Sequence, residues 1–515
     1  MMISRRAFLG GATAFGAFGG SRFFCARADE FLSGVPELTF GVVSDIHFAT
    51  ERKGLIPYYN ADVFVRALEY FRGQGVDAVV CCGDMADRGL IDELRAVGAA
   101  WDRVFPDGKA PDGRPVEKVF VCGNHDWEGQ TYGQLARSVY PDDAAFEAHV
   151  LRNRYDEYWK ECFHEDYRPI YRKTVKGYDF IGQHWDGRGL KGNVAHTMPR
   201  IRDFLQAQKA TLDPSKPFFY VQHPHPKGTC FAALNTATDT GLATRALSKF
   251  PNAVALSGHS HIPFTDDHAI WQGSFTSIAA GSLRWSSRPR AVLDESGRIL
   301  VPGGYENGVG QRAGAAEQPF KLMESYNGYN CHLGMVFRVY KDRMVVSRRD
   351  LKNGLSLGPD WVMPLPAAEP KPFSFAERAK RSISPEFAAG AVAMVERTKA
   401  KTRGGKLKDG TKVPAEEKDV YKVSFPPANA VKGGRVFDYE VVATCGEVRK
   451  SKYVLAAGYN QSAEHPKARE ETACVFAVAD FPSEEIEFSI VPRESYGRRG
   501  RPLFVRMRLS GGKKS

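Results

Sequence analysis

The feature that most constrains this chain is a short polar turn at the end of a strand-like run. Residues 119–121 are Val-Phe-Val, and they run into Cys-Gly-Asn-His-Asp at 122–126. A run of β-forming residues closed by glycine predicts a buried strand whose carboxyl end opens into a loop. Because α/β sheets bind their ligands at such ends, this turn is a candidate site.

Four other segments follow the same design. Residues 38–43 run into Ser-Asp-Ile-His, residues 78–82 into Gly-Asp-Met-Ala-Asp-Arg-Gly, residues 218–221 into Gln-His-Pro-His, and residues 253–256 into Ser-Gly-His-Ser-His. Five strand ends therefore deliver aspartate, histidine and asparagine, the side chains that bind divalent metals through oxygen and nitrogen. The pattern predicts one metal site built from segments far apart in the sequence.

The ordered set resembles the calcineurin-like metallophosphoesterase family. D-x-H, G-D-x-x-D-R-G, G-N-H-D, a strand-terminal histidine and G-H-x-H occur in that order, and the resemblance covers about residues 38–366. Each motif alone is common, whereas the whole set in order is specific. The resemblance implies an α/β fold, a four-layer αββα sandwich over residues 36–366, and a hydrolase that acts on phosphoric ester bonds.

The resemblance also implies the metal ligands. One ion would take Asp45, His47, Asp84 and His261, and the other would take Asp84, Asn124, His223 and His259. Asp84 would be shared, because a ligand that touches both ions must be an anionic carboxylate. His225 competes with His223, which we favour because it directly follows the strand. No thiolate is among the ligands, so two divalent or trivalent ions of Mn, Fe or Zn fit and Cu(I) does not.

The spacing of two ligand pairs fits this assignment. Residues two apart in an extended chain point the same way. Asp45 and His47 can therefore face one cavity together, and so can His259 and His261.

A phosphoester resists attack because its oxygens are negative and water is a poor nucleophile near neutral pH. By resemblance, a metal-bridging hydroxide would attack the phosphorus, and His125 would donate a proton to the leaving oxygen. Asp87 matches the position that orients this histidine and raises its basicity. Arg88 either clamps a phosphate oxygen or is a solvated turn arginine. Asp126 is expected to pin the turn through backbone hydrogen bonds.

Three function classes compete. We favour a phosphodiesterase, because nothing obvious beyond Arg88 is placed to hold a dianion. A phosphomonoesterase or nucleotidase of the same family is the alternative enzyme. The third class is a cell-surface binding protein with a vestigial metal site, and the intact set of motif residues argues against it.

The amino terminus resembles a twin-arginine export signal. Ser-Arg-Arg-Ala-Phe-Leu-Gly at 4–10 precedes a mildly apolar run, and Ala-Arg-Ala at 26–28 supplies a cleavage pattern. We expect residues 1–28 to be removed and the protein to be periplasmic or secreted. The alternative is a cytosolic protein with a basic tail. Cys25 lacks the small preceding residues of a lipid-attachment site. The run is too short to span a bilayer, so no transmembrane segment is expected in the mature chain.

The 515 residues suit two or three domains, and the formal net charge is +11. The charges of both signs are interleaved, and no Lys/Arg block carries stacked aromatics. The sequence therefore gives no clear nucleic-acid patch. Cys81, Cys82 and Cys122 are interpreted as packed thiols, and Cys445 could pair with Cys474 in an oxidising compartment.

Within the first domain, helices are expected at 61–71, 93–101, 142–161 and 240–250, and paired strands at 167–183. Residues 275–281 read as a strand with a glycine break, and residues 286–329 as a loop-rich rim. Residues 334–350 predict a hairpin, and residues 361–366 end the domain. His184 is interpreted as a structural histidine, with a role toward substrate as the alternative.

A Pro-rich linker at 367–384 marks a domain boundary. About seven short strands follow within residues 385–511, which suggests a small all-β, immunoglobulin- or fibronectin-like sandwich. The strands are expected at 391–396, 420–425, 436–443, 453–457, 473–479, 485–491 and 503–509. Residues 399–417 are interpreted as a mobile loop. No catalytic constellation is found in this domain, which resembles accessory β-domains of exported bacterial phosphoesterases.

Overall fold

The computed structural model describes most of the chain beyond the predicted export signal. The described residues are 34–49, 62–127, 142–186, 199–231, 239, 241–287, 292–293, 299–301, 332–367, 369–402, 405–406, 412–429, 436–459 and 471–507. Residues 1–28 and most of the predicted rim 286–329 lie outside them. None of the described helices is long and apolar enough to cross a bilayer.

The first sheet carries the three amino-terminal motif strands. Its order is β14-β13-β12-β1-β2-β3, with β15 beside β13. β1, β2 and β3 are parallel, and β12 closes against β1 in antiparallel register. The strands are β1 Leu38–Val43, β2 Ala78–Cys81, β3 Glu117–Phe120, β12 Leu333–Val339, β13 Arg343–Asp350, β14 Leu355–Ser356 and β15 Trp361–Pro364.

The second sheet carries the two later motif strands. Its order is β4-β5-β6-β7-β9-β8, and β5, β6, β7 and β9 are parallel. The strands are β4 Ile170–Val175, β5 Tyr178–Gln183, β6 Phe218–Val221, β7 Ala253–Ser257, β8 Ile270–Gln272 and β9 Thr276–Ala279. The five predicted motif strands are therefore confirmed, and they divide between two sheets.

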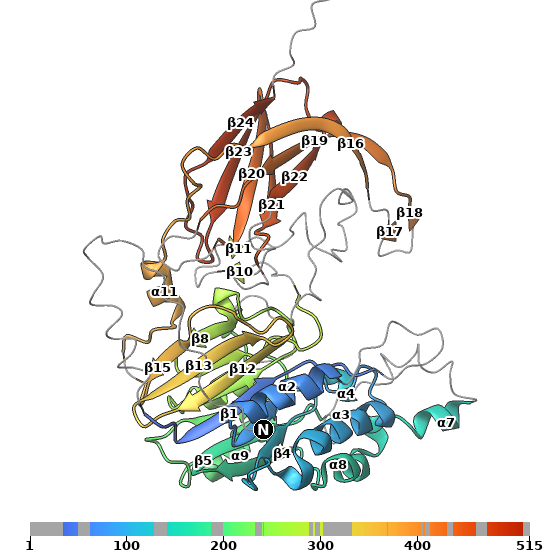
Figure 1. Ribbon diagram of the computed structural model, residues 1–515, viewed down its shortest axis with the longest axis vertical. Coiled ribbons are helices and arrows are strands. Elements are labelled where there is room, and N and C mark those ends of the chain that lie inside the picture. Colours follow the sequence, from blue (N-terminus) through green and yellow to red (C-terminus); the bar gives the residue numbers. More distant parts are fainter. Residues whose placement is uncertain are drawn as a thin grey trace, which may run out of the picture. The chain divides into compact units, whose positions relative to one another are not determined.

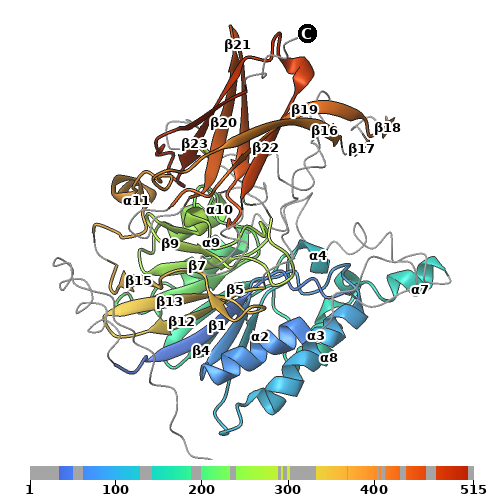
Figure 2. The ribbon, with the colours of Figure 1, turned by 45° about the horizontal axis from the view of Figure 1, so that its top comes forward.

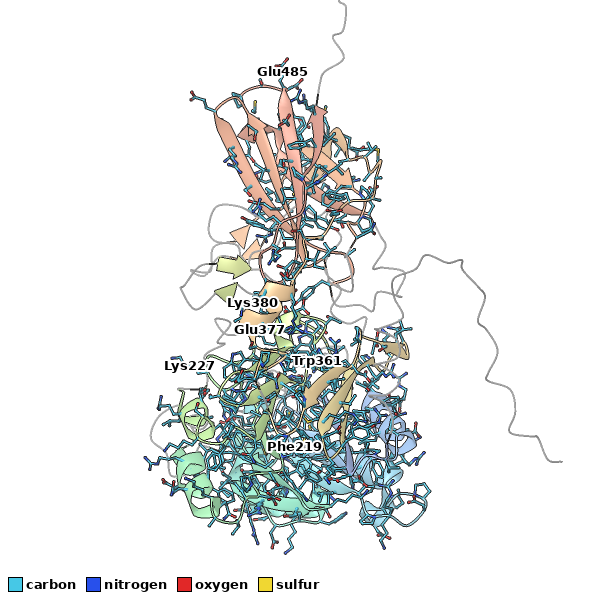
Figure 3. All side chains as sticks on the ribbon, turned by 90° about the vertical axis from the view of Figure 1, so that its left-hand side faces the viewer. Phe219, Lys227, Trp361, Glu377, Lys380 and Glu485 are labelled. Carbon is cyan, nitrogen blue, oxygen red and sulfur yellow. The ribbon has the colours of Figure 1, made fainter. Side chains whose placement is uncertain are left out.

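The two sheets pack face to face through aromatic side chains. The ring of Phe40 in β1 lies 5.2 Å from that of Phe180, 4.6 Å from that of Phe219 and 4.7 Å from that of Phe337. Figure 3 labels Phe219 deep inside this domain. Strands buried on both faces read as continuous apolar runs, which is why they were visible in the sequence.

Helices cover the outer face of each sheet (Figure 1). α2, α3 and α8 pack on the first sheet, and α9 and α10 pack on the second. These helices are α2 Asp62–Gly73, α3 Ile91–Val104, α8 Tyr155–Phe163, α9 Pro199–Gln208 and α10 Leu242–Leu247. The four-layer αββα architecture predicted from the sequence is confirmed.

The remaining short elements lie in the connections. They are α4 Asn124–Trp127, α7 Asp143–Glu147, the 3₁₀ turns η1 Pro106–Gly108, η2 Leu151–Asn153 and η3 Asp267–Ala269, and the strands β10 Val292–Leu293 and β11 Ile299–Val301. The single helix predicted at 142–161 is wrong. The chain breaks between α7 and α8 because Ile91 N–H donates to the His149 carbonyl at 3.0 Å and Leu151 N–H to the Gly89 carbonyl at 2.8 Å.

The carboxy-terminal region forms two further all-β sheets, consistent with a β-sandwich (Figure 2). One sheet has the order β16-β19-β22 and the other β21-β20-β23-β24. All seven predicted strands are present, as β16 Met394–Lys401, β19 Glu417–Phe425, β20 Asp438–Cys445, β21 Val448–Leu455, β22 Thr472–Ala477, β23 Ile486–Arg493 and β24 Leu503–Met507. A 3₁₀ turn, η6 Val478–Asp480, follows β22.

Two expectations for this region are wrong. Residues 399–417 are not only a loop, because β16 and β19 extend into them and β17 Gly405–Lys406 pairs with β18 Lys412–Val413. Opposite charges support the extension, as between Lys399 and Glu417 at 3.6 Å. Cys445 and Cys474 are both thiols, and the Cys445 sulfur lies 3.1 Å from the Ser483 hydroxyl.

The predicted linker at 367–384 contains structure that the sequence did not indicate. Phe373 exchanges backbone and side-chain hydrogen bonds with Gln272 of β8, at 3.0 and 3.2 Å. α11 Phe375–Arg381 follows, and the Ser374 hydroxyl caps it by accepting from Glu377 N–H at 3.2 Å. The linker is therefore anchored to the second sheet.

Candidate metal centre

The loops that follow the motif strands continue to pair with one another beyond the sheets. Asp45 N–H donates to the Gly83 carbonyl and His47 N–H to the Asp84 carbonyl, each at 2.9 Å. In the second sheet, Gly258 N–H donates to the His223 carbonyl at 2.8 Å. This pairing fixes the polar side chains at the carboxyl ends of the strands.

A first group of ligand atoms gathers Asp45, His47, Asp84 and His261, all buried and within 4.8 Å of one another. His261 Nε2 lies 2.9 Å from Asp45 Oδ1. His47 Nε2 lies 3.5 Å from Asp84 Oδ2 and 3.1 Å from His261 Nε2. These are the four residues that the sequence assigned to one ion.

A second group gathers Asp84, His223 and His259. His223 Nε2 lies 3.2 Å from Asp84 Oδ2 and 3.2 Å from His259 Nδ1. Asp84 belongs to both groups, as a shared carboxylate would. His225 is turned to serines instead, because its Nδ1 lies 2.6 Å from Ser257 Oγ and its Nε2 lies 2.9 Å from Ser260 Oγ.

Asn124 and His125 enter the site together at the start of α4. Asn124 is buried, and the His125 N–H donates to Asp84 Oδ1 at 2.9 Å. The ring of His125 lies 4.4 Å from that of His47. Its Nδ1 lies 2.7 Å from the backbone carbonyl of Asp87. The structure therefore places the predicted proton donor beside both groups.

Asp87 contacts two histidines of the site. Its backbone carbonyl accepts from His125 Nδ1 at 2.7 Å, and one of its carboxylate oxygens forms a group with nitrogens of His47 and His125, all within 4.8 Å of one another. The carboxylate lies 3.3 Å from His47 Nδ1 and accepts from Arg284 Nη1. Any residue can supply a carbonyl, so the sequence could not distinguish these roles.

Arg88 is not a solvated turn arginine, since its side chain is buried. Its Nη1 lies 3.6 Å from Glu93 Oε1, and the same carboxylate accepts the Arg88 N–H at 2.8 Å. Asp126 stabilises its turn as expected, because its carboxylate accepts hydrogen bonds from the N–H of Gly123 and the N–H of Ala86, each at 2.7 Å. Asp126 thereby links the second and third motif loops.

His184 has the surroundings of a structural histidine. Its Nδ1 accepts the Cys122 N–H at 3.0 Å, and its ring packs 4.7 Å from Trp159 and 4.6 Å from Tyr167. It supports the strand end that leads to Asn124.

The ligand backbone is strained. Nine described non-glycine residues have φ in the left-handed region, and five of them are candidate ligands: Asp45, His47, Asp84, His259 and His261, with φ between 46° and 68°. The expectation that the two spaced pairs lie on extended chain is therefore wrong. Such backbone persists only where surrounding contacts hold it, and it clusters at functional sites.

The donor atoms fit a cation. His261 Nδ1 lies 3.2 Å from the Trp285 carbonyl, which can only accept, so Nδ1 carries the hydrogen and Nε2 presents a lone pair. His47 Nε2 lies 3.1 Å from that nitrogen. Among the described residues, His47 Nδ1 is a buried nitrogen without a hydrogen-bond partner, although the Asp87 carboxylate is 3.3 Å away.

The electrostatics of the site favour positive charge. Burial by itself lowers the pKa of His47, but the carboxylates of Asp45, Asp87 and Asp84 raise it to about 9. The pKa of His223 is likewise raised to about 9, against its burial, chiefly by Asp84. Burial would raise the pKa of Asp84, yet the neighbouring histidines hold it well below its usual range. The pKa of His259, by contrast, is lowered to about 3, chiefly by burial and by the neighbouring His223. The carboxylates therefore favour positive charge at His47 and His223 and not at every histidine of the site.

Sequence reasoning missed Arg284 and Trp285. Arg284 is buried and donates to the His47 carbonyl at 2.9 Å. The Trp285 ring lies 4.2 Å from that of His261 and 4.6 Å from that of His47. The available signal was a sixth strand end, because β9 ends at Ala279 and the chain continues through Ala-Gly into Ser-Leu-Arg-Trp at 282–285.

Comparison with known proteins shows which sequences and structures this chain is similar to. Residues 38–263 match the sequence model of the calcineurin-like phosphoesterase family. No curated protein matches the chain. Among solved structures, a dimetal phosphatase from Danio rerio is similar at 14% identity, covering 64% of this chain and 98% of that one, with a TM-score of 0.34. A purple acid phosphatase from yellow lupin (Lupinus luteus) seeds is similar at 12% identity, covering 64% and 55%, also with a TM-score of 0.34.

Proposed function

We propose that this protein uses two transition-metal ions to hydrolyse a phosphodiester. The proposal is supported by the match of residues 38–263 to the sequence model of the calcineurin-like phosphoesterase family. The observation that carries the proposal is the position of Asp84. Its Oδ2 lies 3.5 Å from His47 Nε2 and 3.2 Å from His223 Nε2, so one carboxylate oxygen faces the histidines of both groups.

The proposal assigns each ligand to an ion. Asp45, His47, Asp84 and His261 would hold the first ion, and Asp84, Asn124, His223 and His259 the second. Two such ions supply Lewis acidity toward the phosphoryl oxygens and activate water near neutral pH. Nitrogen and oxygen donors of this kind suit Mn, Fe or Zn.

His125 is proposed to protonate the leaving oxygen. The Asp87 carbonyl accepts from Nδ1 at 2.7 Å and so fixes the plane of the ring. This leaves Nε2 as the nitrogen that can transfer the proton. Burial lowers the pKa of His125 below its ordinary value, and the carboxylates of Asp84 and Asp87 oppose this shift only in part. General acid catalysis of this kind contributes about 10²- to 10⁴-fold.

The pairing of the nearby arginines favours a diester over a monoester. Arg88 faces Glu93, and Arg284 donates to Asp87. In the described part of the site, both guanidinium groups therefore already face carboxylates. A monoester dianion needs more compensating charge than a diester monoanion, so this arrangement suits the diester.

Turnover of a bis-aryl phosphate diester and of a mono-aryl phosphate tests the substrate class. We expect Mn²⁺ to activate diester hydrolysis, a chelator to abolish it, and the diester to be turned over faster than the monoester. Faster monoester turnover would support the phosphatase or nucleotidase alternative. Two bound ions without turnover of either ester would support the binding-protein alternative.

Two variants test the residue roles. Asp84→Asn should abolish turnover and lower the metal content, because it removes the shared anion. His125→Ala should abolish turnover and retain both ions. His164→Ala is the matched control, because His164 lies outside the site with a side chain 67% exposed. Loss of metal in His125→Ala would contradict the role proposed for that residue.

We also propose that the protein is exported through its twin-arginine-type signal. The supporting observation is the Arg5-Arg6 pair followed by an apolar run and Ala-Arg-Ala at 26–28. Expression with Arg5→Lys and Arg6→Lys combined should leave an uncleaved precursor in the cytoplasm, while the unaltered chain is processed. Equal processing of both would refute this route.

A further inference from the structure

The segment Ser282–Ser287 contacts three of the four ligands of the first proposed ion, Asp45, His47 and His261. It follows β9 and lies beyond the residues that match the family model. Ser282 Oγ donates to the Asp45 carbonyl at 3.2 Å, and Ser287 N–H donates to the His261 carbonyl at 2.6 Å. One continuous stretch of chain therefore contacts two ligands of this ion through their backbone.

Arg284 connects the segment to a third ligand. Its Nη1 donates both to the His47 carbonyl, at 2.9 Å, and to Asp87 Oδ1. The same Asp87 oxygen lies 3.3 Å from His47 Nδ1. Arg284 thus holds the backbone of His47 directly and its imidazole through Asp87. The guanidinium also packs 5.0 Å from the Trp285 ring, which restricts its position.

His261 is held in a similar way from the other end of the segment. Its Nδ1 donates to the Trp285 carbonyl at 3.2 Å, which directs Nε2 toward Asp45 at 2.9 Å. The second proposed ion has different support, since His223 Nδ1 donates to the Cys82 carbonyl at 2.7 Å. The two ions would therefore depend on different parts of the chain.

We infer that Ser282–Ser287 is a support segment for the first metal ion and that Arg284 is its positioning residue. This inference rests on the proposed function. Asp45, His47 and His261 adopt left-handed backbone, which needs contacts of this kind to persist. A carboxylate on the distal nitrogen of a ligating histidine fixes its tautomer and orientation, and loss of such outer contacts costs about 10- to 100-fold in metal affinity.

The test is metal binding by Arg284→Met, measured by equilibrium competition with a chelator and by metal content after dialysis. We expect the affinity for one ion to fall by about 10- to 100-fold while the other ion is retained. With Mn²⁺, the spectroscopic signature of a coupled ion pair should give way to that of a single ion. Arg284→Lys should show an intermediate loss, because its ammonium keeps the charge and the donors but lacks the planar guanidinium that packs against the Trp285 ring.

Arg343→Met is the matched control. Arg343 is also buried, packs 4.2 Å from a Tyr340 ring and pairs with Asp342 at 2.7 Å. It lies at the opposite end of the first sheet, since neighbouring Val339 pairs with Leu38 at the start of β1. This variant should bind both ions as the unaltered protein does.

The outcomes separate this inference from the proposed function. If the unaltered protein binds fewer than two ions, the proposed function fails. Suppose instead that the unaltered protein binds two ions. If Arg284→Met then binds both ions with unchanged affinity, or loses both ions equally, only the support role is overturned. Asp87→Asn should weaken the binding of the same ion. The double variant with Arg284→Met should lose less affinity than the product of the two separate fold-losses, because both residues act through His47.

Discussion

Gly258→Ala offers a sharp test of how tightly the metal centre is packed. Gly258 lies between the end of β7 and His259. A Cβ at this position would lie 1.8 Å from Ser44 Oγ and 2.4 Å from Asp45 Oδ2. Ordinary contacts between such atoms are about 3.5 Å, so the side chains of Ser44 and Asp45 must move by more than about 1 Å.

The expected damage is larger for catalysis than for stability. Two of the atoms in the way are ends of side chains, which can rotate, whereas Ser44 Cβ, at 2.9 Å, moves only with its backbone. We therefore expect the free energy of unfolding to fall by about 1–3 kcal/mol. Asp45, however, lies 2.9 Å from His261 Nε2 and accepts the His259 N–H at 3.1 Å. Rotation breaks both contacts, and a ligand displaced by about 1 Å costs about 10²-fold in turnover.

Gly73→Ala is the matched control, because a Cβ there meets nothing within 4 Å. Gly73 is the exposed last residue of α2, and alanine favours helix by about 1 kcal/mol. Urea unfolding, metal content and diester turnover should be compared for both variants. If Gly258→Ala binds two ions and keeps turnover within about twofold of the unaltered enzyme, the reasoning from this close approach is refuted.

Other predictions follow from single contacts. Asp126→Ala should lower the free energy of unfolding, measured by urea titration, by about 2–4 kcal/mol. The reason is that the buried N–H groups of Gly123 and Ala86 lose their acceptor. A change below about 1 kcal/mol would contradict this. Phe219→Ala should cost about 3–5 kcal/mol by the same measurement, because the ring packs against Phe40 between the sheets; retention of full stability would show that the sheets close over the cavity. Mn²⁺ at 100 times its dissociation constant should stabilise the metal-free protein by about 2.7 kcal/mol in thermal unfolding, and an unchanged midpoint would mean that no ion binds the folded state.

The sheets could be predicted from the sequence because their strands are buried on both faces. β1, β2, β3, β6 and β7 read as apolar runs ended by polar turns. Four of them were located to within one residue, and β3 begins two residues earlier than predicted. Boundaries set by tertiary contacts were less visible. The break between α7 and α8 depends on pairing with residues 89–91, which no local pattern indicates.

The candidate ligands could also be predicted, because the sequence gives the identity of every side chain that can bind a metal. The contacts that hold them were not visible, because many use backbone carbonyls: those of Asp87, Cys82 and Trp285 each face a histidine nitrogen. Every residue type supplies a carbonyl, so no residue pattern marks these partners. Arg284 was missed because it reaches the site from a loop at no fixed spacing from the motifs.

The left-handed ligand residues explain why the site requires so much external support. Each such residue costs about 1–3 kcal/mol, and five of them lie in three loops around a cluster of buried carboxylates. Loops that stored this strain alone would relax and scatter the ligands. Here they are bound to one another through backbone pairing, as from His47 to Asp84 and from Gly258 to His223, and are enclosed by the support segment 282–287. A cation bound by side chains from several of these loops would hold the loops together, so metal binding and loop order should reinforce each other.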